Sequence, residues 1–128
     1  MSLCDIKILL VEDNEMNRQL CCDILEIYHA QVHEAESAEE GLEYLESEIP
    51  DLILMDIQLP GMDGMQATRI IKQRPGWSQI PVVAVTAHAM TGEMEKIRQA
   101  GFDGQISKPF TITNFVAEIF RLLGIESE

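Results

Sequence analysis

Positively charged residues are scarce in this sequence of 128 residues. Nine Lys and Arg residues stand against 22 Asp and Glu residues, so the formal net charge is −13. Proteins that bind nucleic acids or anionic membranes hold phosphates with Lys and Arg, so this composition argues against both kinds of partner. Long apolar runs are also missing, since none approaches the ~20 residues that span a bilayer. The first residues are too polar, and carry too little positive charge, for a signal peptide.

Cysteine is rare as well, since the chain has only Cys4, Cys21 and Cys22. The sequence contains no Cys-x-x-Cys pair and no Cys/His spacing typical of zinc ligands. Cys21 and Cys22 are adjacent, so on a helix they point in different directions. We therefore expect reduced cysteines that serve packing in a cytoplasmic protein, with neither a disulfide nor a zinc site.

The length of the chain suits one domain, and no linker, internal repeat or low-complexity stretch interrupts it. Hydrophobic residues make up 46% of the sequence, which is enough for a core. We predict a single domain over residues 1–128, with loose ends at residues 1–4 and 125–128.

Apolar runs alternate with helical patterns along the chain. The runs predict strands at residues 6–11, 32–35, 52–55, 80–85 and 105–107. The helical patterns cover about residues 14–27, 37–49, 64–74, 91–100 and 112–123. In the first helix, Met16, Leu20, Ile24 and Ile27 recur at helical spacing, which predicts that they form its inward face.

Regular strand-helix alternation predicts an α/β fold in which a parallel sheet has helices on both faces. The three continuously apolar strands should lie in the centre, because central parallel strands are buried on both sides. The more polar second and fifth strands should form the edges. Right-handed crossovers then favour the strand order 2-1-3-4-5 of a flavodoxin-like, doubly wound (βα)5 sheet.

Carboxylates follow two of the central strands. Glu12 and Asp13 end the first strand and Asp56 ends the third. Because strand C-termini of such a sheet meet at one edge, these side chains should converge, and their mutual repulsion calls for a cation. Mg²⁺ prefers oxygen ligands in octahedral geometry. We predict that Asp13, Asp56 and the backbone carbonyl of Gln58 bind it.

A nucleophile and two charge-stabilising groups complete the predicted site. Asp56 ends the central strand and can form an acyl phosphate, as aspartate nucleophiles do. Lys108 offers a compact ammonium to a phosphoryl oxygen, and Thr86 offers a hydroxyl to another. Neutralising the charge on the transferred group is most of what phosphoryl-transfer catalysis requires.

Four motifs in order make the chain resemble a response-regulator receiver domain over essentially its whole length. They are ILLVEDN at residues 8–14, DLILMD at 51–56 with LPGMDG at 59–64, VTA at 85–87 and SKPF at 107–110. The stretches at residues 12–18, 66–69 and 86–90 further resemble receivers of hybrid sensor kinases and single-domain cell-cycle-type regulators. The sequence leaves open whether the chain is a free regulator or a fragment of a larger protein.

The resemblance implies a phosphorelay role with Mg²⁺ as the cofactor. Asp56 would accept the phosphoryl group from a histidine kinase or phosphotransfer protein, and Glu12 would bind the metal through water. A cis bond between Lys108 and Pro109 is also implied. The fourth helix, fifth strand and fifth helix would present a changed face to a downstream protein. Such a domain is not a turnover enzyme.

One position departs from the family pattern. Three residues before the lysine the family usually carries a Tyr or Phe whose rotation reports phosphorylation, and here Gln105 stands there. Thr86 can still move toward the phosphoryl group as the sensor. At the rim of the site, the small Ala87 leaves room for that group, and His88 either gates water or is simply solvated.

Three other functions fit the sequence less well. An aspartate-nucleophile phosphatase typically carries a second aspartate two residues after the nucleophile, where this chain has Gln58. A flavodoxin-like cofactor binder needs a Ser/Thr/Gly-rich loop after the first strand, where the acidic Glu12 and Asp13 would repel a nucleotide. A receiver-like module that acts without phosphorylation would not need all the site positions to be filled, as they are here.

Overall fold

The computed structural model describes residues 3–86 and 93–124. Its elements follow the predicted alternation: β1 Lys7–Val11, α1 Glu15–Ile27, β2 Gln31–Ala35, α2 Ala38–Leu45, β3 Leu52–Asp56, α3 Gly64–Gln73, β4 Val82–Thr86, α4 Glu93–Ala100, β5 Gly104–Ser107 and α5 Ile112–Leu123. The five strands form a parallel sheet in the order β2-β1-β3-β4-β5. The predicted fold class and strand order are therefore confirmed.

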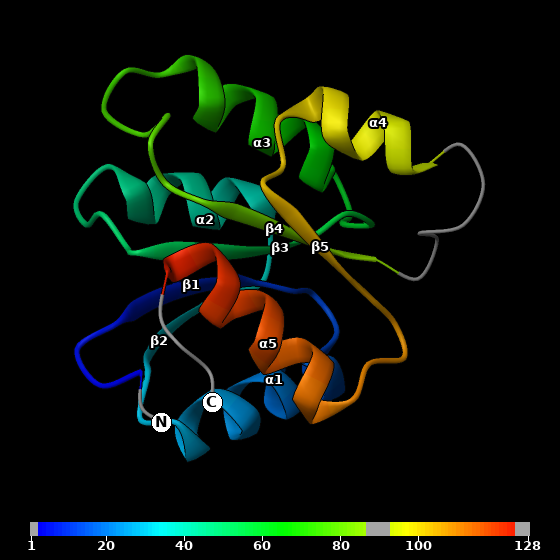
Figure 1. Cartoon of the computed structure of the whole chain (residues 1–128). Coiled ribbons are helices and arrows are strands. Elements are labelled where there is room, and N and C mark those ends of the chain that lie inside the picture. Colours follow the sequence, from blue (N-terminus) through cyan, green and yellow to red (C-terminus); the bar gives the residue numbers. More distant parts are fainter. Residues whose placement is uncertain (1–2, 87–92, 125–128) are drawn as a thin grey trace.

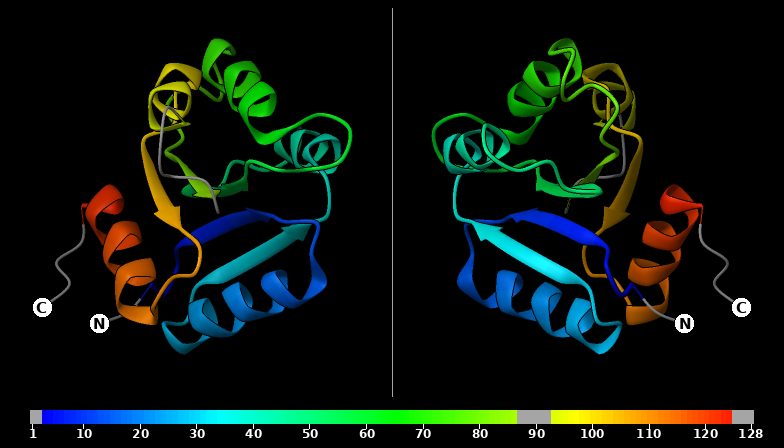
Figure 2. Two further views of the ribbon diagram at one scale, coloured as in Figure 1. Left: turned by 90° about the vertical axis from the view of Figure 1, so that its right-hand side faces the viewer. Right: turned by 90° about the vertical axis from the view of Figure 1, so that its left-hand side faces the viewer.

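The helices cover both faces of the sheet. Helices α1 and α5 lie on one face, and α2, α3 and α4 lie on the other (Figures 1 and 2). Alternate residues of each central strand point into two separate hydrophobic cores, so that Leu10 and Leu54 join the α1/α5 core while Leu9 and Ile53 join the opposite one. Burial on both faces explains why β1, β3 and β4 are continuously apolar.

The register brings the strand C-termini together at one edge of the sheet. Val11 pairs with Met55, Asp56 pairs with Val85, and Thr86 pairs with Ser107. The residues that follow β1, end β3 and β4, and follow β5 therefore meet at this edge. This is the edge at which open α/β sheets bind ligands.

Side-chain caps begin four of the helices at the expected residue types. Asn14, Ser37, Asp63 and Thr111 each accept a hydrogen bond from the backbone N–H three residues later. Asp63 and Gln66 form a reciprocal capping box. Each such cap satisfies a backbone donor that would otherwise lack a partner and contributes about 1 kcal/mol.

The predicted inward face of α1 is wrong in three of its four residues. Ile24 is buried, but Met16, Leu20 and Ile27 are 82%, 48% and 62% exposed. The helix instead packs through Cys21, Ile24 and Leu25. Periodicity alone cannot distinguish an apolar stripe that faces the core from a second one that faces outward.

The beginning of the chain is not loose at Leu3, contrary to the prediction for residues 1–4. Leu3 is fully buried in the α1/α5 core, and its N–H donates to the carbonyl of Tyr28 at 2.6 Å. Cys4, Cys21 and Cys22, all within the described residues, are not joined in disulfides. Cys21 is buried and packs, whereas Cys4 is exposed and does not fill the packing role expected of it. In the part of the chain described, no helix combines the length and apolarity needed to cross a membrane.

Candidate functional site

An acidic cluster lies where β1 and β3 end. Glu12 and Asp56 are buried and Asp13 is exposed, and one carboxylate oxygen of each lies within 4.8 Å of the others. The parallel pairing of β1 with β3 produces this convergence, because it places the end of each strand beside the other. The predicted meeting of these three side chains is therefore found in the structure.

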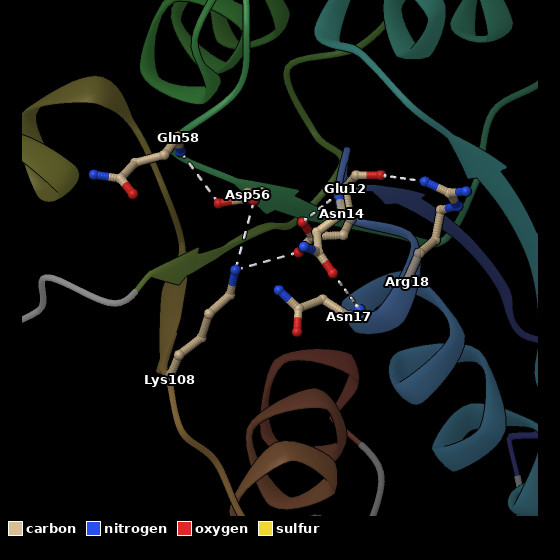
Figure 3. A network of polar contacts seen from close by, with 7 residues as sticks. All are labelled: Glu12, Asn14, Asn17, Arg18, Asp56, Gln58 and Lys108. Carbon is tan, nitrogen blue, oxygen red and sulfur yellow. Dashed lines mark hydrogen bonds and ion pairs between the residues drawn. The ribbon is translucent and has the colours of Figure 1, made fainter.

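Glu12 is held at both its side chain and its backbone (Figure 3). Its Oε2 accepts the Asn14 N–H at 3.1 Å, and its Oε1 accepts from Lys108 Nζ at 3.3 Å. Its backbone carbonyl accepts from Arg18 Nη1 at 2.9 Å. The Arg18 side chain is only 13% exposed and also pairs with Glu34 at 3.2 Å. The loop that carries Glu12 and Asp13 is thus anchored from α1.

Asp56 lies in a mostly enclosed position at the end of β3. Its Oδ1 accepts the Gln58 N–H at 3.1 Å, and its Oδ2 lies 3.6 Å from Lys108 Nζ. Burial, followed by the hydrogen bond and the negative charge of Glu12, raises the pKa of Asp56 to about 7, although Lys108 and the Gln58 N–H oppose this shift. Near neutral pH and without a cation, this carboxyl is therefore poised between its two protonation states.

Lys108 and Thr86 reach the same edge from β5 and β4. The Lys108 N–H donates to the Thr86 carbonyl at 2.7 Å, which fixes the start of the loop after β5 against the end of β4. The Lys108–Pro109 peptide bond is cis, as the resemblance implied. Thr86 is buried and comes one residue after Val85, the β4 partner of Asp56.

The chemistry of this cluster fits a small hard cation. Its donor atoms are carboxylate oxygens close enough together to share one ion, and the exposed Asp13 leaves it open to solvent. Asp13 and Asp56 are suitable ligands for Mg²⁺, which binds through one or two carboxylates and keeps several waters. Both oxygens of Glu12 already accept hydrogen bonds from Asn14 and Lys108, which suits an indirect role through water.

The structure places some predicted site residues apart from this cluster. Gln105 is half-buried on β5, paired with Ala84, and lines a hollow of about 330 Å³ between α4 and β5. It therefore lies on the face predicted for output. Ala87 and His88, the predicted rim residues, lie outside the described part of the chain.

Sequence reasoning missed Arg18, although it belongs to the stretch that carries the finer resemblance. The available signal was its position one turn into the helix that follows the acidic pair, where a long side chain can reach back to the preceding loop. It also missed a hollow of about 350 Å³ lined by Asn17, Leu20, Lys108, Pro109 and Phe110, which connects α1 to the site.

Arg18→Gln is expected to weaken Mg²⁺ binding roughly three- to tenfold, since residues that orient metal ligands typically contribute at least this much. Loss of the contact with the Glu12 carbonyl should loosen the loop that carries Asp13. Calorimetric titration measures the affinity. In the metal-free protein, hydrogen exchange at the Asn14 amide should also become faster.

Glu34→Gln is the matched control, because it removes the negative charge of the other partner of Arg18 and leaves the contact with Glu12. Its Mg²⁺ affinity should stay within about twofold of the starting protein. Equal losses in the two variants would show that Arg18 acts through Glu34 rather than by holding the loop.

Comparisons with known proteins agree with this geometry. The family model of the response regulator receiver domain matches residues 8–120. The polar-differentiation response regulator DivK of Brucella ovis is 42% identical over 117 residues, which cover 91% of this chain and 95% of the relative. The chain therefore covers nearly the whole length of that relative.

Solved structures show the same relationship. The receiver domain of sensor histidine kinase PA1611 from Pseudomonas aeruginosa, with a magnesium ion coordinated in its active site cleft, is 33% identical, with a TM-score of 0.87 over 93% of this chain and 98% of that one. A CheY-like receiver domain protein from Methanospirillum hungatei is 32% identical, with a TM-score of 0.83 over 93% and 94% of the two chains. This chain belongs to the response regulator receiver domain family and is a receiver domain of two-component signalling.

Proposed function

We propose that Asp56 is the phosphoacceptor of this receiver. A carboxylate oxygen of Asp56 attacks the phosphorus of a phosphohistidine on a histidine kinase or phosphotransfer protein. The bond from phosphorus to the histidine nitrogen breaks, and the imidazole leaves with the electron pair and takes up a proton. The observation that carries the proposal is the convergence of Glu12, Asp13, Asp56 and Lys108 at one edge of the sheet.

Each neighbour of Asp56 has a separate role. Asp13, Asp56 and the Gln58 carbonyl would hold Mg²⁺, with Glu12 acting through a bound water; the ion supplies positive charge to the phosphoryl oxygens when bound. Lys108 already lies 3.6 Å from Asp56 and adds a second positive charge. The Thr86 hydroxyl donates a hydrogen bond to an oxygen of the phosphoryl group on Asp56. Together these groups offset the negative charge of the transferred group.

The phosphodonor docks on α1 and the loops beside it. The outward apolar residues Met16, Leu20 and Ile27 supply a surface of the kind that buries against a partner. The hollow that includes Leu20 and Lys108 joins this surface to the site. Asn14, which caps α1, follows Asp13 directly, so a donor bound there lies close to the acidic cluster.

The output surface is the face formed by α4, β5 and α5. Movement of Thr86 toward the phosphoryl group would pull on the loop to α4, a helix that buries Ile97 and Ala100 but leaves Met94 exposed. Because Gln105 replaces the usual aromatic residue, this movement rather than a ring rotation carries the signal. The chain acts in the cytoplasm as a phosphoacceptor domain, not as a turnover enzyme.

Incubation with acetyl phosphate and Mg²⁺ should add one phosphoryl group to the protein, seen as a mass increase of the intact chain. Asp56→Asn should show no increase, because an amide is not a nucleophile for this reaction. Omission of Mg²⁺ should abolish the gain in the unaltered protein. A gain that survives Asp56→Asn would disprove the assignment of Asp56.

A further inference from the structure

Negative charge is concentrated in the first half of the chain. Residues 1–63 contain sixteen acidic and two basic residues, a formal charge of −14, whereas residues 64–128 contain six acidic and seven basic residues, a formal charge of +1. The strand order places β2, β1 and β3 at one side of the sheet, with α1 and α2. The excess negative charge therefore lies on the side of the molecule that contains the α1 surface.

The exposed face of α1 combines apolar and acidic side chains. Met16, Leu20, Asp23 and Ile27 are spaced four, three and four residues apart, which places them along one stripe of the helix. All four are exposed, so a carboxylate lies within the apolar stripe. Glu15 and Glu26 are exposed as well.

The basic residue of α1 does not offset this charge. Arg18 is the sole Lys or Arg between Glu15 and Ile27. Its side chain is mostly buried, and its donors bind the Glu12 carbonyl and the Glu34 carboxylate. Within α1, the accessible charges are consequently all negative.

We propose that the phosphodonor binds this face with an apolar helical ridge flanked by Lys and Arg, and that the exposed carboxylates of α1 select such donors. This inference rests on the proposed function, because it concerns the protein that delivers the phosphoryl group. A cation of the donor pairs with Asp23 while apolar side chains cover Met16, Leu20 and Ile27. Complementary charge accelerates the encounter, and an acidic donor is repelled at the same surface.

The α4-β5-α5 face, at the β5 edge of the sheet, does not share this preference. On α4 and α5, Arg98 pairs with Glu95 and Arg121 pairs with Glu118. Their charges are balanced, so a partner of the α4-β5-α5 face is not selected by strong negative potential. Donor and output partner are thereby distinguished by charge as well as by position.

The test uses one phosphorylated histidine phosphotransfer domain with a basic docking surface, and the same domain with those Lys and Arg residues changed to Glu. Transfer to the receiver is timed at low and high salt. The face variant carries Glu15→Gln, Asp23→Asn and Glu26→Gln. The control variant carries Glu36→Gln, Glu40→Gln and Glu43→Gln on and before α2, which removes the same charge from exposed positions elsewhere.

For the basic donor, the second-order transfer rate should fall roughly tenfold in the face variant and less than about twofold in the control variant, and high salt should remove the difference. The acidic donor should be slow with the unaltered receiver and faster with the face variant. Equal rates for both donors, or equal losses in both variants, would overturn the inference.

Acetyl phosphate separates this inference from the function on which it rests. It needs no docking surface, so the unaltered protein and both variants should gain the phosphoryl mass equally. Failure of that labelling would count against Asp56 as the acceptor. Normal labelling without a preference for the basic donor would overturn the docking proposal alone.

Discussion

Replacing Asp56 with Asn is expected to stabilise the metal-free protein at pH 8 by about 2 kcal/mol. Burial and Glu12 raise the pKa of Asp56 to about 7, whereas an Asp in an unfolded chain titrates near 3.9. Between these pH values the folded state binds a proton that the unfolded state does not. The free energy of unfolding therefore falls as pH rises from about 4 to above 7.

The size of the effect follows from the difference between the two pKa values. The two pKa values differ by about three units, and each pKa unit corresponds to about 1.4 kcal/mol of stability. Burying the Asn amide has a smaller desolvation cost of its own. The expected net gain is therefore about 2 kcal/mol. At pH 4, where the native carboxyl is protonated, the gain should nearly vanish. Urea unfolding in EDTA, followed by circular dichroism, measures the free energy across this range.

The effect of Mg²⁺ on the stability of the two proteins provides a matched comparison. At pH 8 Mg²⁺ should stabilise the unaltered protein by binding the folded state, and should stabilise Asp56→Asn much less. A difference between the two proteins that stays constant from pH 4 to pH 8 would contradict the raised pKa. An equal response of both proteins to Mg²⁺ would show that Asp56 is not a ligand.

Gly64→Ala is expected to destabilise the protein by about 3 kcal/mol, near the upper end for overpacking a closed position. A Cβ at residue 64 would lie 2.2 Å from the Asp56 carbonyl oxygen and 2.9 Å from the Ile57 Cα. Both neighbours are backbone, so neither can rotate away. The Gly64 N–H also donates to the Ile57 carbonyl at 3.0 Å, which would have to lengthen.

The displacement should reach the site, because the atom nearest to the new methyl group belongs to Asp56. Mass labelling by acetyl phosphate should become slower in the fraction that remains folded. Gly76→Ala is the control: beyond its two chain neighbours, no atom of the described residues lies within 4 Å of the added Cβ, and stability should change by less than about 0.5 kcal/mol. Unfolding free energies that match in the two variants would show that the close approach at Gly64 is relieved without cost.

The positions of the acidic residues along the chain made the site predictable. Asp56 and Thr86 end strands, and the pair Glu12 and Asp13 follows one. Identifying these segments as parallel strands was therefore enough to predict that their terminal side chains meet at one edge of the sheet. The same reasoning located Lys108, because a short strand precedes it. The caps that the structure shows at Asn14 and Asp63 are local as well, since each depends on a hydrogen bond three residues away.

Arg18 and the outward stripe of α1 were not predictable in this way. Arg18 donates a hydrogen bond to the backbone carbonyl of Glu12. Every residue has a backbone carbonyl, so the sequence does not indicate which one the Arg18 side chain contacts. Met16, Leu20 and Ile27 share helical spacing with Ile24, yet only Ile24 faces the core. Which stripe is buried depends on how the helix is rotated against the sheet, and the packing of Cys21 and Leu25 settles that rotation.

The pattern of apolar strands, helices and strand-end carboxylates by itself determined the fold class, the strand order and the convergence of Glu12, Asp13 and Asp56, because these follow from short-range periodicity and from the geometry of parallel sheets. Tertiary structure alone decided that Asp56 and Glu12 are buried together, that Lys108 lies between them, and that α1 presents an acidic, apolar face. These properties arise from distances between residues far apart in the chain, such as Glu12 and Lys108, which local pattern does not encode.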